Sequence, residues 1–128
     1  MGMEILVVDD SAIDRELYAT CLRVEGHEVT CADGPGALVE LSRKRWDVIF
    51  VDVLMPDVDG LEVIMAARAQ EHAPKIIAMS GDGIRSSWEY LRLADVLGAD
   101  LCLSKPLDPA LIAWAAAPAA TPAAADAA

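Results

Sequence analysis

Short apolar runs and longer amphipathic stretches alternate five times along the 128-residue chain. Three of the runs, at residues 4–8, 48–51 and 75–79, are almost entirely apolar and end at polar or turn residues, a pattern typical of strands buried on both faces of a parallel sheet. We therefore predict five strands, at residues 4–8, 28–31, 48–51, 75–79 and 101–103. Because each strand is followed by a helical pattern, the fold class predicted is α/β, a doubly wound parallel sheet with helices on both faces.

Capping residues mark where the intervening helices begin and end. Ser11, Asp33 and Asp108 can each cap the start of a helix, and Gly26 and Gly98 can each close one. The predicted helices cover about 12–25, 34–45, 61–71, 86–97 and 109–117. In the first of them, apolar residues recur on one face at helical spacing, namely Ile13, Leu17, Cys21 and Val24.

The length fits one domain, which we place at residues 1–117. Residues 118–128 are rich in Ala and Pro and are expected to form a disordered tail or the stub of a linker. There is no apolar run long enough for a membrane helix and no basic segment typical of a secretory signal, so we expect a cytoplasmic protein. The three cysteines, Cys21, Cys31 and Cys102, are widely spaced and are expected to be reduced.

The formal net charge is −11. Such a charge repels phosphate backbones and anionic lipids, which argues against direct binding to nucleic acid or to a membrane. It is compatible with the binding of cations.

Polar residues stand where the predicted strands end: Asp9, Asp10, Asp52, Ser80 and Lys105. In a parallel sheet these ends meet at one edge, where ligands of such folds bind. Two carboxylates about 4 Å apart repel by about 4 kcal/mol at an effective dielectric constant near 20. The site must therefore raise a carboxyl pKa, pair with Lys105 or recruit a divalent cation. Oxygen ligands without Cys or His favour Mg²⁺ or Mn²⁺ over zinc.

Each of these residues also has an ordinary structural interpretation. Asp9, Asp10 and Asp52 could cap helices or turns, Ser80 precedes loop glycines, and Lys105 could be a solvated surface charge. Their joint occurrence at strand ends is what favours a functional site.

The same residues resemble the motifs of the receiver domains of two-component response regulators. The resemblance covers about residues 4–117 and rests on Asp9-Asp10, on Asp52-Val53-Leu54-Met55-Pro56-Asp57-Val58-Asp59-Gly60, on Ser80 and on Lys105-Pro106. It implies a flavodoxin-like sheet and a phosphoacceptor signalling domain rather than an enzyme. Slow self-dephosphorylation is compatible with this role. It also implies a histidine kinase or histidine phosphotransfer protein as phosphoryl donor and signalling through contacts with a downstream protein that the sequence does not identify.

Roles for individual residues follow from this resemblance. Asp52 would accept the phosphoryl group; Asp10 would bind Mg²⁺ directly and Asp9 through water. Asp52 and the backbone carbonyl of Leu54 would complete the protein's share of the metal shell. Ser80 and Lys105 would each contact a phosphoryl oxygen.

The chain departs from the family pattern in three places. Cys102 stands where the family usually has an aromatic ring that moves inward on phosphorylation. The segment from Ser80 to Lys105 is longer than usual, with the extra residues expected at 81–85, in a mobile loop over the site. The last helix is short, and Trp114 is its only large ring.

Other interpretations of the motifs fit less well. Asp57 and Asp59 superficially resemble the nucleophile motif of haloacid-dehalogenase-like phosphatases, but that motif should follow an apolar strand directly. A calcium loop fails because Met55 and Ala66 would occupy ligand positions. Two alternatives stay open: a receiver-like interaction module that does not use phosphate, and an N-terminal receiver cut from a larger effector protein.

Overall fold

The computed structural model describes residues 2–55, 59–81 and 85–118, and the fold prediction is confirmed there. Five strands form one parallel sheet in the order β2-β1-β3-β4-β5. The strands are β1 (Glu4–Val8), β2 (Glu28–Ala32), β3 (Val48–Asp52), β4 (Lys75–Ser80) and β5 (Leu101–Ser104).

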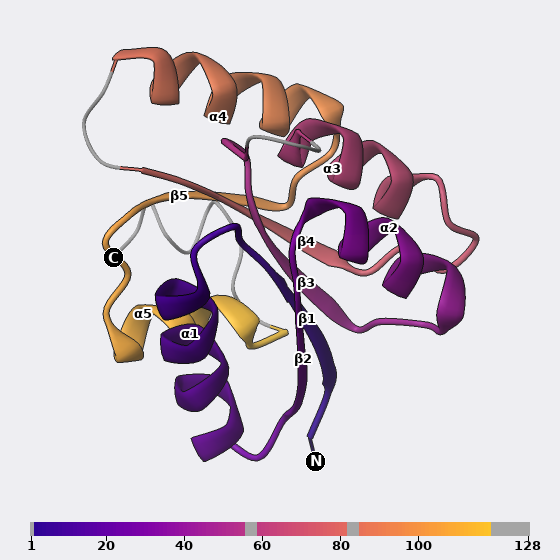
Figure 1. The fold of residues 1–128 in the computed structure, drawn as a ribbon, viewed down its shortest axis with the longest axis vertical. Helices are drawn as coiled ribbons and strands as arrows, with labels where there is room; N and C mark the ends of the chain where they lie inside the picture. Colours follow the sequence, from indigo (N-terminus) through magenta and orange to yellow (C-terminus); the bar gives the residue numbers. More distant parts are fainter. Residues whose placement is uncertain (1, 56–58, 82–84, 119–128) are drawn as a thin grey trace.

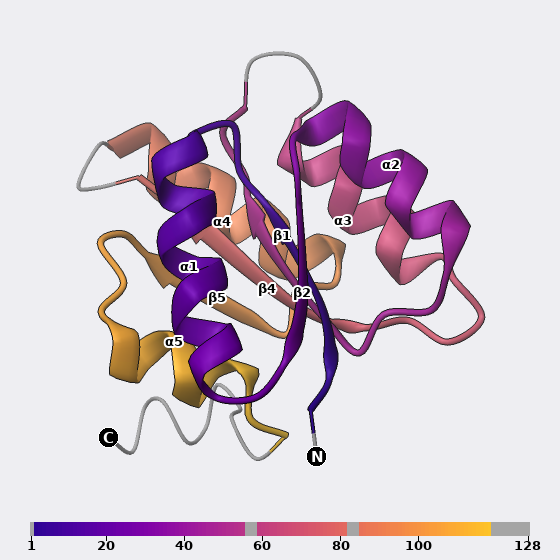
Figure 2. The same cartoon turned by 60° about the horizontal axis from the view of Figure 1, so that its bottom comes forward.

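The helices lie in two layers (Figures 1 and 2), with α1 and α5 on one face of the sheet and α2, α3 and α4 on the other. Their bounds are α1 (Ala12–Val24), α2 (Gly34–Arg43), α3 (Gly60–Arg68), α4 (Arg85–Leu97) and α5 (Pro109–Ala116). Each predicted helix is present, and the boundaries differ from the prediction by a few residues at most.

The two layers enclose two hydrophobic cores, one on each face of the sheet. Along β1, Ile5 and Val7 point to the α1 and α5 side, whereas Leu6 and Val8 point to the other helices. All four side chains are fully buried. A parallel sheet covered on both faces needs such continuously apolar strands, which explains the pattern in the sequence.

Side-chain caps start the helices where the sequence predicts them. The side chains of Ser11, Asp33 and Asp108 accept hydrogen bonds from backbone N–H groups in the first turns of α1, α2 and α5. Gly26 and Gly98 follow α1 and α4 with positive φ angles of 93° and 116°, a conformation that glycine adopts without strain.

The apolar face predicted for the first helix is not the face that packs on the sheet. Ile13 and Val24 are 81 % and 80 % exposed and Leu17 is half-exposed, whereas Tyr18, Ala19 and Leu22 are buried. Helical periodicity identifies a face with apolar residues, but packing selects the face that also carries Tyr18.

Cys21, Cys31 and Cys102 are free and partly buried, in agreement with reduced thiols. Within the described ranges, no helix is long and apolar enough to cross a membrane. The predicted tail lies outside these ranges from residue 119 onward.

Candidate functional site: an acidic cluster with a buried lysine

The sheet brings the predicted site residues together at the carboxyl ends of its strands. Asp9 directly follows β1, Asp52 and Ser80 are the last residues of β3 and β4, and Lys105 directly follows β5. Because β1, β3 and β4 are adjacent, the first three lie side by side. Lys105 reaches them from β5, where its backbone N–H donates to the Ser80 carbonyl oxygen at 2.7 Å.

Asp52 is buried at the centre of this edge, with 6 % of the residue exposed. Its Oδ1 accepts a hydrogen bond of 3.0 Å from the backbone N–H of Leu54. Its Oδ2 lies 3.3 Å from the ammonium group of Lys105. Each carboxylate oxygen therefore has one donor, and the strand end holds the group in a fixed orientation.

The ammonium group of Lys105 contacts three carboxylates. Its Nζ lies 2.6 Å from Asp9, 3.0 Å from Asp14 and 3.3 Å from Asp52. Its side chain is only 14 % exposed, so these pairs are largely shielded from water. The peptide bond from Lys105 to Pro106 is cis.

Asp9, Asp10 and Asp52 form a cluster suited to a divalent cation. One carboxylate oxygen from each lies within 4.8 Å of the others. Asp9 and Asp52 are buried and Asp10 is exposed, so the cluster opens to solvent on the side of Asp10. Three hard oxygen donors with access to water fit Mg²⁺, which binds proteins through a few carboxylates and keeps several waters.

The pKa values at the site reflect burial and mutual charge. Burial raises the pKa of Asp52 to about 6, although the Leu54 hydrogen bond and Lys105 oppose the rise. Burial alone would lower the pKa of Lys105, but its hydrogen bond to Asp9 and the charge of Asp52 raise it above its usual range. The lysine therefore stays charged, and the carboxylates need it or another cation.

Ser80 is a buried polar residue whose hydroxyl group is not satisfied by any of the described residues. The side chain is fully buried, and its Oγ has no hydrogen-bond partner among the described residues. A buried hydroxyl without a partner costs free energy, and such a group in a native structure is often kept for function.

Two residues at the site go beyond what the sequence predicts. No role at the site was predicted for Asp14, yet its carboxylate contacts Lys105. Tyr18 lies one turn further along α1, with its ring centre 5.9 Å from the Lys105 Nζ. Burial raises the pKa of Tyr18 to about 12. The signal available is spacing: Asp14 and Tyr18 are four residues apart in the predicted helix and so share one of its faces.

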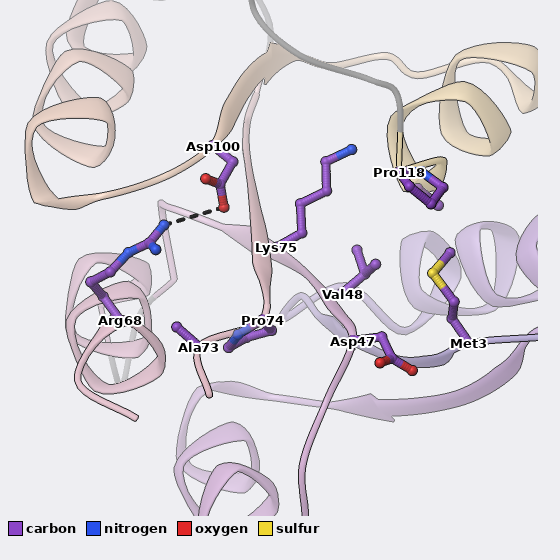
Figure 3. Close-up of a pocket in the computed structure, with 10 residues that line it drawn as sticks. Met3, Asp47, Val48, Arg68, Ala73, Pro74, Lys75, Asp100 and Pro118 are labelled. Atoms are coloured by element: carbon purple, nitrogen blue, oxygen red, sulfur yellow. Dashed lines mark hydrogen bonds and ion pairs between the residues drawn. The ribbon is translucent and has the colours of Figure 1, made fainter. Parts of the chain in front are cut away.

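A cavity of about 490 Å³ opens over this cluster and is lined by Asp10, Asp14, Tyr18 and Lys105 among others. A second cavity, of about 550 Å³, lies at the opposite edge of the sheet (Figure 3). Its charged groups serve the fold: Arg68 pairs with Asp100, and Lys75 donates to the Ala115 and Ala117 carbonyl oxygens at 2.7 and 2.8 Å. The candidate functional site is therefore the acidic cluster.

The three departures from the family pattern have different outcomes. Cys102 is partly buried, and its Sγ lies 3.5 Å from the Leu91 carbonyl oxygen, so no ring occupies this position between β5 and α4. Residues 82–84 of the predicted loop, and residues 56–58 of the turn after Met55, lie outside the described ranges. Helix α5 is as short as predicted, and Trp114 packs partly buried against the core beneath it.

Residues 5–117 match the family model of the response regulator receiver domain. The chain is 32 % identical over 109 residues to Protein PilG of Pseudomonas aeruginosa, covering 82 % of this chain and 78 % of that protein. It is 33 % identical over 105 residues to the probable transcriptional regulatory protein TcrX of Mycobacterium tuberculosis. That match covers 80 % of this chain but only 43 % of TcrX.

Solved structures show the same fold. The chemotaxis response regulator CheY4 of Vibrio cholerae superposes with a TM-score of 0.77 at 32 % identity, covering 88 % of this chain and 93 % of that one. The receiver domain of the sensor histidine kinase PA1611 of Pseudomonas aeruginosa superposes with a TM-score of 0.74 at 31 % identity, covering 86 % and 90 %. That structure has a magnesium ion coordinated in its active-site cleft. With its strand order and its acidic pocket at the expected strand ends, the chain belongs to the response regulator receiver family, a family of two-component signalling domains.

Proposed function

We propose that this receiver domain accepts a phosphoryl group on Asp52 from a histidine kinase or a histidine phosphotransfer protein. The observation that carries the proposal is the setting of Asp52: a buried carboxylate next to two further carboxylates, Asp9 and Asp10, with the Lys105 ammonium 3.3 Å away. Phosphoryl transfer depends on positioning and on neutralising charge, and this arrangement supplies both.

In the transfer, an oxygen of Asp52 forms a bond to phosphorus as the bond between phosphorus and the donor's histidine nitrogen breaks. The electron pair of that bond stays on the imidazole. The Leu54 N–H, at 3.0 Å, holds one oxygen of Asp52 in place. Lys105 balances the charge that the phosphoryl oxygens bring, and the unpartnered Ser80 hydroxyl donates to one of them.

Mg²⁺, or Mn²⁺ in its place, would be held by Asp10 directly, by Asp9 through water, by Asp52 and by the Leu54 backbone carbonyl. When bound, the cation would add positive charge to the pocket and so favour the binding of a phosphoryl anion. Without it, Lys105 is the single cation in contact with these carboxylates among the described residues.

The signal would leave through contact with a downstream protein, since phosphorylation can shift a two-state domain toward a partner-binding form. We assign this receiver to residues 1–117, treat 118–128 as a tail or linker, and expect it in the cytoplasm. The chain spans less than half of TcrX, so an N-terminal receiver of a longer effector is the alternative organisation.

The test is incubation of the purified chain with acetyl phosphate and Mg²⁺, followed by intact mass spectrometry. One added phosphoryl group is expected, and it should be absent with EDTA and absent in Asp52→Asn. Asp47→Asn is the matched control, because Asp47 lies at the other end of β3 and its side chain accepts from the Glu4 N–H. Labelling that persists in Asp52→Asn would move the acceptor elsewhere.

A second candidate is a receiver-like interaction module that no longer uses phosphate. The observation favouring it is Cys102, which leaves β5 without the ring expected at this position. Absence of labelling in the wild-type chain under the same conditions would select this candidate.

A further inference from the structure

Three carboxylates use the whole hydrogen-bonding capacity of Lys105. An ammonium group has three N–H donors, and the Lys105 Nζ lies within 3.3 Å of Asp9, Asp14 and Asp52. A phosphoryl oxygen that contacts Lys105 must therefore take a donor from one of these carboxylates.

The three carboxylates differ in what happens to them when the site is loaded. Asp52 becomes an acyl phosphate and loses its negative charge as a carboxylate. Asp9 belongs to the cluster proposed to face the metal ion. Asp14 belongs to neither group, so phosphorylation of Asp52 and metal binding do not engage its carboxylate directly.

The backbone of Asp14 is anchored at the start of α1. It lies in the first turn of α1, where the helix dipole favours a negative charge. Its backbone N–H donates to the Ser11 side chain at 3.3 Å, so the cap fixes the position of the main chain and leaves the carboxylate free for Lys105. The carboxylate is about one-third exposed, whereas the side chain of Asp9 is fully buried.

We propose that Asp14 is a positioning residue that holds one N–H donor of Lys105 on the α1 side of the pocket and thereby weakens retention of the phosphoryl anion on Asp52. The inference rests on the proposed function of Asp52. One N–H donor of Lys105 that the phosphoryl anion needs is already bound to the Asp14 carboxylate. This competition lowers the affinity of the pocket for the anion.

The experiment uses beryllofluoride as the stand-in for the phosphoryl group, titrated into the chain at saturating Mg²⁺ and followed by amide NMR. Asp14→Asn, which keeps the shape and removes the charge, should lower the Kd for beryllofluoride roughly fivefold, as expected for losing a partly exposed ion pair. Asp14→Glu, which restores the charge, should return the Kd toward the wild-type value. Glu16→Gln, on the exposed side of the same helix, should leave it unchanged.

A second measurement reports on Lys105 itself in the absence of any ligand. The ¹Hε and ¹³Cε signals of its side chain should shift in Asp14→Asn and not in Glu16→Gln, while the melting temperature stays within a few degrees of wild type. The helix cap does not use the Asp14 side chain, so folding should survive the substitution.

The measurements distinguish failure of the role of Asp14 from failure of the proposed function of Asp52. An unchanged or higher Kd in Asp14→Asn, with normal wild-type binding, overturns the role of Asp14 and leaves the proposed function intact. A lower Kd without a shift of the Lys105 signals also overturns it, because the effect would then be direct repulsion. If wild type does not bind beryllofluoride, or Asp52→Asn still binds it, the proposed function fails, and the role of Asp14 falls with it.

Discussion

Gly60 packs directly against the backbone carbonyl of Asp52, so closely that a Cβ atom at position 60 would overlap the carbonyl oxygen. The same atom would lie 2.5 Å from the Cα of Val53, so rotation of a side chain cannot relieve the clash. The first residue of α3 and the last residue of β3 are therefore in contact through their main chains. The position of the acceptor depends on a glycine in the next helix along the chain.

Gly60→Ala is expected to destabilise the fold by about 2 kcal/mol and to reduce phosphorylation of Asp52, because the backbone beneath the acceptor must move. Urea denaturation and acetyl phosphate labelling would measure the two effects. Gly81→Ala is the control for the stability measurement alone, because Gly81 lines the pocket and a Cβ there meets nothing within 4 Å among the described residues. Equal stability of both variants would show that the contact can relax.

The stability of the metal-free protein should depend on the ionisation of Asp52. Its pKa is raised to about 6, from an ordinary value near 3.8, by burial. The folded state then binds this proton more tightly than the unfolded chain, so the contribution of Asp52 to stability is fully present below about pH 4 and is lost as pH rises through 6.

This loss should be at most about 3 kcal/mol, at 1.36 kcal/mol per pKa unit. Urea denaturation of wild type and Asp52→Asn between pH 4 and 8 would measure it. Asp52→Asn should be the more stable protein above pH 6, with the difference shrinking toward pH 4. A difference that does not vary with pH would mean that Asp52 titrates normally.

Mg²⁺ should raise the melting temperature by mass action, as any ligand of the native state does. Asp10→Asn should remove most of this increase and slightly stabilise the metal-free protein, because it removes one charge from a repelling cluster. Asp33→Asn makes the same charge change at the cap of α2 and should behave as wild type. A melting temperature that is constant across millimolar Mg²⁺ would argue against a metal site.

Ser80→Ala should separate stability from anion binding. Removing a fully buried hydroxyl that has no partner among the described residues should raise the free energy of unfolding by up to about 1 kcal/mol. The affinity for beryllofluoride should fall, because the proposed donor to the anion is gone. Cys102→Ala, on the neighbouring strand, should leave that affinity unchanged, since the thiol contacts the Leu91 carbonyl and not the pocket.

Most of the fold could be predicted because the strands and caps are local signals. The apolar strands and the residues that cap α1, α2 and α5 identify each element without reference to its neighbours. The face of α1 that packs on the sheet could not be predicted in the same way. Ile13 and Val24 recur at helical spacing as apolar residues do in a core, and only the tertiary fold shows that solvent surrounds them.

The residues of the site also differ in whether local sequence signals predict them. Asp9, Asp52, Ser80 and Lys105 could be predicted to share one edge of the sheet, because each stands where an apolar strand ends. Asp14 could not be assigned, because its contact with Lys105 joins residues 91 positions apart. No local pattern distinguishes an aspartate that completes a helix cap from one that also binds a distant lysine.

Ser11 connects the helix start to the charged pocket through its hydroxyl group and its backbone N–H. Its side chain accepts from the Asp14 N–H at 3.3 Å, and its own N–H donates to Asp9 at 2.9 Å. We therefore expect the first turn of α1 and the acidic cluster to open and close together. The rate of amide hydrogen exchange in the first turn of α1 should therefore report on the pocket. A ligand bound in the pocket should slow this exchange, and replacement of Asp9 should accelerate it.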